Sequence, residues 1–188
     1  MIITINGKPG AGKSTVSTLL AKKLHLRHYS IGDFMRELAL DRGISLLELS
    51  KLAEKDKEID KILDNRQKKL AKKDNFVIDS RLGFYFIPNS LKIFLECDLD
   101  TSAKRIFNQQ RQSEKENVTL ATTKKNIKKR MDLEKIRYKK YYNLNCYDLK
   151  NYDYVIKIDA LTPSKIVTKI LNFIKNKQKS KPLKKTWH

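Results

Sequence analysis

The chain has 188 residues, of which 40% are hydrophobic and 33% are charged, and this length and composition fit a single globular domain. No apolar run reaches the roughly 18–20 residues that a membrane-spanning helix needs. The two cysteines, Cys97 and Cys146, lack the paired spacing of a zinc site or a disulfide framework. No basic segment precedes the apolar N-terminal residues, so a secretory signal is not indicated, and we expect a cytoplasmic protein.

The net charge is +20, from 41 Lys+Arg and 21 Asp+Glu. One interpretation is affinity for nucleic acid, and the other is a site for an anionic small molecule in a lysine-rich chain. The lysines of residues 51–73 are interleaved with acidic residues, which is typical of solvated helix faces. Aromatic residues do not alternate with the basic runs, as a stacking platform for single strands requires. We therefore expect no dedicated nucleic-acid site, although the charge permits non-specific affinity at low salt.

The first predicted elements are a strand, a phosphate loop and a helix. Residues 2–6 predict a short strand, and the following Gly-x-x-x-x-Gly-Lys-Ser pattern leads into helical spacing over 14–24. Glycines in this pattern allow turns that direct several N–H groups at one anion, and Lys13 adds a charge for the β- and γ-phosphates. The Ser14 hydroxyl is a suitable Mg²⁺ ligand, and the helix dipole also favours an anion. We therefore predict a nucleoside triphosphate site.

Beyond this loop, apolar runs alternate with helical patterns, as in a parallel sheet covered by helices. Further strands are predicted at 27–30, 76–79, 91–97 and 154–158. Helices are predicted at 34–43, from 45 onward, at 58–73, 98–112 and 119–142, and from 163 onward. The order predicts an α/β fold, a three-layer phosphate-loop architecture with a five-stranded parallel sheet.

The predicted domain spans residues 1–175, and the basic segment 176–188 is expected to be a flexible tail. The core of this domain comprises residues 1–32, 73–107 and 121–175. Two polar excursions interrupt the core, a helical one at 33–72 and a short lid at about 108–120. Because a doubly wound sheet binds its ligands at the carboxyl ends of its strands, candidate residues follow the first three strands or lie in the excursions.

Charged residues follow the second and third predicted strands. After the second strand, Asp33 is predicted to cap a helix, and Arg36 one turn further on presents a planar fork suited to a phosphate. An ordinary helix cap with a surface arginine would look the same. After the third strand, Asp79 is placed to anchor Mg²⁺, and Arg81 is a second phosphate fork. The alternative there is a salt bridge that closes the end of the sheet.

Four more arginines stand out because arginine is scarce beside lysine in this chain: Arg105, Arg111, Arg130 and Arg137. Arg130 and Arg137 are seven residues apart on one predicted helical face, with Glu134 between them. A surface ladder of ion pairs would give the same spacing. Phosphoryl transfer, however, gathers negative charge that several guanidinium groups stabilise, so the pattern favours a phosphate site.

Taken together in this order and spacing, the motifs resemble those of nucleoside monophosphate kinases, most closely the archaeal-type cytidylate kinases. The resemblance extends from Met1 to about Lys175. It rests on residues 7–15, 30–36, 46–67, 77–83 and 130–138. The chain departs from that pattern at Lys8, where proline is frequent, and at Ser80, where glycine is frequent, so the turn before Arg81 is less defined.

The resemblance implies an adenylate-kinase-like fold and transfer of a phosphoryl group from ATP to CMP or dCMP, with Mg²⁺ as cofactor. It implies catalytic roles for Lys13, Arg81, Arg130 and Arg137. It implies ATP binding by Gly7, Lys8, Pro9, Gly10, Ala11, Gly12, Lys13, Ser14, Thr15, Arg105 and Arg111. It implies monophosphate binding by Ser30, Gly32, Asp33, Arg36, Asp60, Arg66 and Arg81, with Asp60 and Arg66 near the base. Ser14 and Asp79 would serve the metal.

No general base is required, because the acceptor phosphate oxygen already carries charge near neutral pH. We accordingly expect structural roles for His25 and His28, and a monomeric enzyme. Two alternatives stay open. A few hydrogen bonds choose the base, so the acceptor could instead be AMP or UMP. The net charge of +20 keeps an RNA- or ribosome-associated ATPase of adenylate-kinase shape as the alternative from another class.

Overall fold

Five parallel strands form one sheet in the order β2-β3-β1-β4-β5. Their bounds are Ile2–Gly7 (β1), Arg27–Ser30 (β2), Phe76–Asp79 (β3), Leu91–Glu96 (β4) and Tyr154–Lys157 (β5). The structure is a computed structural model, and it describes residues 1–109 and 112–179. The predicted five-stranded parallel sheet is confirmed, and β1 occupies its centre, so the phosphate loop leaves the middle of the sheet.

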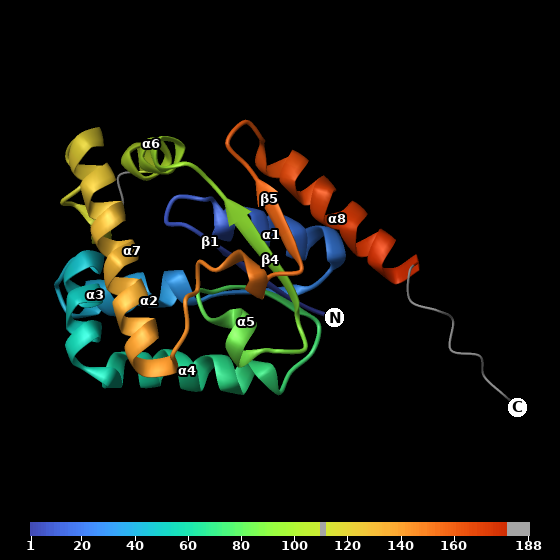
Figure 1. Ribbon diagram of the computed structural model, residues 1–188, viewed down its shortest axis with the longest axis horizontal. Helices are drawn as coiled ribbons and strands as arrows, with labels where there is room; N and C mark the ends of the chain where they lie inside the picture. The colour runs from blue at the N-terminus through green and yellow to red at the C-terminus, as the bar shows by residue number, and fades with distance from the viewer. Residues whose placement is uncertain (110–111, 180–188) are drawn as a thin grey trace, which may run out of the picture.

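Helices cover both faces of the sheet, which completes the predicted three layers (Figure 1). The α-helices are Lys13–Leu24 (α1), Ile31–Asp41 (α2), Leu46–Lys55 (α3), Lys57–Ala71 (α4), Gly83–Phe86 (α5), Leu99–Gln109 (α6), Leu120–Tyr142 (α7) and Pro163–Lys179 (α8). Helix α3 starts where the sequence predicted a helix, from residue 45 onward, and Ser45 and Glu48 form a capping box at its start. Helix α8 continues beyond the expected end of the domain at residue 175, as far as Lys179.

Helix α2 begins earlier than the sequence predicted, directly after β2. Ser30, not Asp33, is its N-cap, because the Ser30 hydroxyl accepts a hydrogen bond from the Asp33 backbone N–H at 3.1 Å. Gly32 therefore lies in the first helical turn, where no turn-forming glycine is needed. The consequence for the site is that Ser30 ends β2 and starts α2 at the same point, close to the end of β3.

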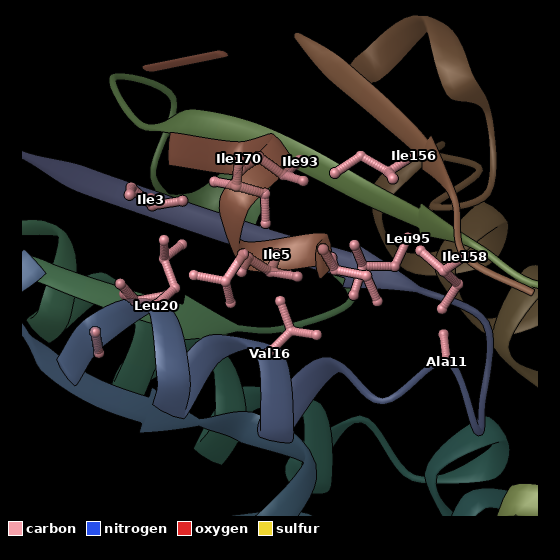
Figure 2. Close-up of a cluster of buried hydrophobic side chains, with 14 of the residues drawn as sticks. Ile3, Ile5, Ala11, Val16, Leu20, Ile93, Leu95, Ile156, Ile158 and Ile170 are labelled. Carbon is pink, nitrogen blue, oxygen red and sulfur yellow. The ribbon is translucent and has the colours of Figure 1, made fainter. Parts of the chain in front are cut away.

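A hydrophobic core on one face of the sheet holds the phosphate-loop helix in place (Figure 2). Ile3 and Ile5 of β1 pack against Val16 and Leu20 of α1, and Ile170 of α8 closes the same cluster. Each of these side chains is almost completely buried, and burial of such a residue contributes roughly 1.5–3 kcal/mol. The loop between β1 and α1 is thus anchored at both ends by the core.

The opposite face of the sheet packs against the helical excursion. Phe76 and Ile78 of β3 contact a second buried cluster that includes Met35 of α2, Leu49 of α3 and Leu63 of α4. Helix α7 passes from α6 to α3 and α4, where the Tyr142 hydroxyl donates to Asp64 Oδ2 at 2.7 Å (Figure 1). Among the described residues, no helix combines the length and hydrophobicity needed to cross a membrane.

Candidate active site

Five arginines and the phosphate loop surround one cavity of about 420 Å³ at the carboxyl ends of the strands. The arginines are Arg36, Arg81, Arg105, Arg130 and Arg137. They come from α2, from the segment after β3, from α6 and from α7. The structure thus brings together guanidinium groups that lie up to about a hundred residues apart in the sequence, and a polyanion is the ligand that such a wall favours.

The phosphate loop has the backbone shape that its glycines predict. Gly10 and Gly12 have φ values of 77° and 73°, which side chains with a Cβ rarely adopt. Lys13 folds back over the loop, and its Nζ donates to the carbonyl oxygens of Gly7 at 3.0 Å and Lys8 at 3.1 Å. Burial, and next the charge of Arg81, hold the Lys13 pKa well below its usual value. The oxygens of a bound phosphate would place negative charge next to the Lys13 ammonium and favour its charged form.

Glu134 of α7 joins two of the arginines. It accepts from Arg81 Nε at 2.8 Å and from Arg130 Nε at 3.2 Å, and the Tyr147 hydroxyl donates to it as well. Burial opposes ionisation of this carboxyl, but the charges of Arg81 and Arg130 prevail and lower its pKa to about 2. Glu134 is therefore a carboxylate at neutral pH and fixes both guanidinium groups. The sequence indicated the spacing of Arg130 and Glu134, but nothing in it indicated Tyr147.

Arg137 forms a different pair, with Asp60 of α4. Arg137 Nε lies 3.4 Å from Asp60 Oδ2, and its Nη2 donates to the Tyr138 hydroxyl at 3.0 Å. Within the described residues, Asp60 Oδ2 and Arg137 Nε and Nη1 are buried without a hydrogen-bond partner. Burial, against the opposing charge of Arg137, raises the Asp60 pKa to about 6. Buried polar atoms rarely lack hydrogen bonds, so this pair, which lies in the cavity wall, is a feature that a ligand site would explain.

Asp79 lies where β3 ends, beside Ser14 of the phosphate loop. Its Oδ1 accepts from the Ser30 hydroxyl at 2.9 Å and from the Ser14 hydroxyl at 3.3 Å. Its Oδ2 lies 2.9 Å from His28 Nε2, so His28, which was expected to be structural, contacts the site. A hydroxyl and a carboxylate oxygen side by side, next to a phosphate loop, are the hard oxygen donors that Mg²⁺ prefers. Ser14 and Asp79 therefore fit the predicted metal role.

The remaining predicted monophosphate residues divide into two groups. Gly32 and Arg36 line the cavity, and Arg36 is paired with Asp33 one turn earlier. Arg66 lies outside the cavity, with its guanidinium carbon 4.3 Å from the centre of the Phe34 ring, and it is exposed. The neighbouring residue, Gln67, faces the cavity instead. Arg66, which was predicted near the base, is therefore one position away from the residue that α4 turns towards the cavity.

Helix α4 presents three hydrogen-bonding side chains to the cavity: Asp60, Asp64 and Gln67. Their spacing of four and then three residues puts them on one helical face. Gln67 is also fixed by Ser80, whose hydroxyl donates to its Oε1 at 2.5 Å. The helical period was visible in the sequence, but which face of α4 turns inward depends on its packing against β3 and α5.

The predicted ATP residues occupy the other end of the cavity. The loop residues from Pro9 to Thr15 line it, whereas Gly7 and Lys8 contribute the carbonyl groups that hold Lys13. Arg105 lines it too, and its Nη2 donates to the Ile158 carbonyl oxygen at 3.4 Å. Arg111, the other arginine predicted to bind ATP, lies outside the described residues.

Two comparisons with known sequences identify the family of this chain. The Cytidylate kinase-like family matches residues 2–160. The cytidylate kinase of Methanobrevibacter smithii is 37% identical over 176 residues, covering 93% of this chain and 99% of that protein. The cytidylate kinase of Methanocaldococcus jannaschii is 40% identical over 161 residues, covering 83% of this chain and 87% of that protein.

Solved structures share the fold at lower identity. An uncharacterized protein from Eubacterium ventriosum matches with a TM-score of 0.66 and 23% identity, over 93% of this chain and 98% of that one. Shikimate kinase from Aquifex aeolicus matches with a TM-score of 0.59 and 20% identity, over 95% of this chain and 98% of that one. These likenesses support the architecture, and the sequence matches support the lineage. The chain belongs to the cytidylate kinase-like family.

Proposed function

We propose that the protein transfers the γ-phosphoryl group of ATP to the phosphate of CMP or dCMP, giving ADP and CDP or dCDP. The observation that carries this proposal is the single cavity in which a phosphate loop and five arginines meet. Two anionic substrates fit such a cavity, with the donor on the loop and the acceptor beside α2 and α4. The names of the relatives point to the same reaction.

Catalysis in this proposal is alignment and charge stabilisation. The loop N–H groups and Lys13 hold the donor phosphates, and Arg36 and Arg81 hold the acceptor phosphate. Arg130 lies beside Arg81 on the shared carboxylate of Glu134, where it can stabilise charge on the transferred group. The acceptor phosphate oxygen attacks the γ-phosphorus in line, and ADP leaves with the electrons of the broken bond.

Mg²⁺ is part of the proposal, and Ser14 and Asp79 are the residues that would serve it. When bound, the ion neutralises charge on the donor phosphates. The two excursions predicted from the sequence, residues 33–72 and about 108–120, would close over the substrates and exclude water, since an open site would hydrolyse ATP. We place the reaction in the cytoplasm and expect a monomer to perform it.

The base of the acceptor would lie against α4. Asp60 is a carboxylate acceptor suited to an exocyclic amino group, and the guanidinium of Arg137, whose Nη1 has no hydrogen-bond partner within the described residues, is suited to the ring nitrogen and carbonyl beside it. Cytosine presents that combination, whereas uracil turns a carbonyl oxygen towards the carboxylate. This arrangement extends the predicted role of Asp60 and moves Arg137 from the transferred phosphate towards the base.

An ADP-release assay with ATP, Mg²⁺ and one acceptor at a time tests the proposal, using CMP, dCMP, UMP, AMP and GMP. The Lys13→Ala protein, purified in the same way, controls for contaminating kinases. A strong preference for CMP and dCMP supports the proposal. Preference for UMP or AMP contradicts the assignment of the base, and turnover that needs RNA instead of a monophosphate favours the ATPase alternative, which the charge of +20 supports.

A further inference from the structure

His28 stands in the middle of a hydrogen-bonded chain that ends at the proposed metal residues. Its Nε2 lies 2.9 Å from Asp79 Oδ2, and its Nδ1 lies 3.2 Å from Thr18 Oγ1. Thr18 is one turn after Ser14 on α1, so Ser14 contacts Asp79 directly whereas Thr18 contacts the imidazole. The register of β2 and β3 places Ser30 opposite Asp79 and His28 two residues earlier. The imidazole thus connects α1 to the end of β3.

The two oxygens of Asp79 have different partners. Hydroxyl groups of Ser14 and Ser30 donate to Oδ1, and the imidazole contacts Oδ2. An aspartate carboxyl turns about a broad two-fold torsion, so contacts to one oxygen alone define its plane poorly. A hydrogen-bond donor to the second oxygen fixes the orientation of the carboxylate plane. When Nε2–H donates to Asp79, Nδ1 is left as the acceptor for the Thr18 hydroxyl, and both ring nitrogens are satisfied.

We propose that His28 is a positioning residue for the Mg²⁺–nucleotide site. The His28 imidazole holds the Asp79 carboxylate so that Asp79 Oδ1 stays beside Ser14. This inference rests on the proposed function, in which Ser14 and Asp79 serve the metal. His28 touches neither substrate nor metal and acts through Asp79. Asp79 is 2% exposed, so little water competes for the oxygen that the imidazole occupies. Partners of metal-binding carboxylates are usually needed for full metal affinity.

Calorimetric titration of ADP, with and without Mg²⁺, tests this role apart from turnover. The two variants are His28→Leu, which removes the donor, and His28→Gln, whose amide N–H₂ reaches the position of Nε2. We expect His28→Leu to bind metal-free ADP like the parent protein and to lose about tenfold or more of the gain in affinity that Mg²⁺ provides. His28→Gln should recover most of that gain.

Two results would overturn the proposal. One is a His28→Leu protein in which Mg²⁺ increases ADP affinity as much as in the parent protein. The other is a His28→Leu protein that loses as much affinity for ADP without Mg²⁺ as with it, which would show that His28 only supports the loop. His25→Asn is the matched control, because His25 is exposed at the end of α1 with a φ of 54°, which asparagine tolerates. It should behave like the parent protein, and a comparable loss there would contradict a role exerted through Asp79.

Thr18→Val provides a graded test further along the chain. It removes the hydroxyl that orients the imidazole but keeps the imidazole itself, so we expect a loss of about two- to threefold in the Mg²⁺-dependent gain, as for a single weak hydrogen bond. The titration needs no CMP. A parent protein that gains ADP affinity with Mg²⁺ yet fails to phosphorylate CMP would therefore leave this inference standing while the proposed function fell.

Discussion

The two ends of the cavity are built in different ways. The donor end is built mainly from main chain, a loop with glycines at positive φ and a helix start that the core of Ile3 and Ile5 anchors, and Lys13 and Arg105 add their charges to it. The acceptor end consists of side chains from separate helices, with Asp60 on α4 and Arg137 on α7. A backbone site accepts any nucleoside triphosphate, whereas a side-chain site can be specific for one base. The difference predicts which substitutions abolish the reaction and which ones redirect it.

The largest effect is expected at the donor end. Lys13→Ala removes the ammonium group beside the donor phosphates, and we expect kcat to fall by at least about 10²–10³-fold with every acceptor. Stability should not suffer, because burial already disfavours this charge and holds its pKa low. Steady-state kinetics and thermal unfolding measure both expectations. Lys22→Ala on the exposed side of α1 is the control, and near-normal turnover by Lys13→Ala would remove Lys13 from the mechanism.

Glu134→Gln tests the link between the two ends. It leaves the largely buried Arg81 and the half-buried Arg130 without their carboxylate, so we expect the free energy of unfolding in urea to fall by about 3 kcal/mol, the lower end of the range for a buried pair. The loss should be smaller with ATP present, because phosphates restore negative charge near the arginines. Asp132→Asn on the exposed side of α7 should change neither property. Unaltered stability of Glu134→Gln would show that the arginines do not depend on this carboxylate.

Asp60→Asn tests specificity at the acceptor end. An amide can donate to the carbonyl oxygen of uracil, whereas the carboxylate accepts from the amino group of cytosine. We expect the ratio of kcat/KM for CMP to that for UMP to fall by about tenfold, the worth of one good buried hydrogen bond. Asn65→Asp, on the exposed side of α4, serves as the control. An unchanged ratio, with both activities intact, would move the base away from Asp60.

The pH dependence of KM for CMP is the smallest expected effect. Burial raises the Asp60 pKa to about 6, while Arg137 opposes this shift, Asp64 adds to it and Lys57 opposes it. Asp60 is therefore almost fully ionised above about pH 7, and it becomes protonated as the pH falls through 6. KM for CMP should rise about fourfold between pH 7.5 and 5.5, from the fraction of Asp60 that remains ionised. In Asp60→Asn this part of the pH dependence of KM should be absent, and only the part that comes from titration of the substrate phosphate should remain.

The donor end of the cavity was predicted more completely from the sequence than the acceptor end. The loop was found because all its residues are adjacent, and each residue type has its own reason to be there. The five-stranded sheet followed from alternating patterns. Asp33 was wrongly taken as the cap of α2, because Ser30 ends a strand and caps a helix at once. Arg66, which was predicted near the base, lies outside the cavity that Gln67 lines, because the sequence did not show which face of α4 packs on the sheet.

No sequence motif indicated the contacts between segments that are distant along the chain. Tyr147 reaches Glu134 only because the chain turns back after α7, and no motif marks a tyrosine for that purpose. His28 was expected to be structural, since the proposed phosphoryl transfer requires no general base. Its partner Asp79 is 51 residues away, and only the pairing of β2 with β3 brings the two together.

The central claim is that donor and acceptor phosphates meet in one cavity, and following the γ-phosphate of ATP tests it most directly. Incubation with ATP labelled at that phosphate, Mg²⁺ and CMP should place the label in CDP, with one ADP formed for each CDP. The label should stay in ATP when CMP is omitted. Label that appears as inorganic phosphate, at the same rate with and without CMP, would contradict the account and make the protein an ATPase.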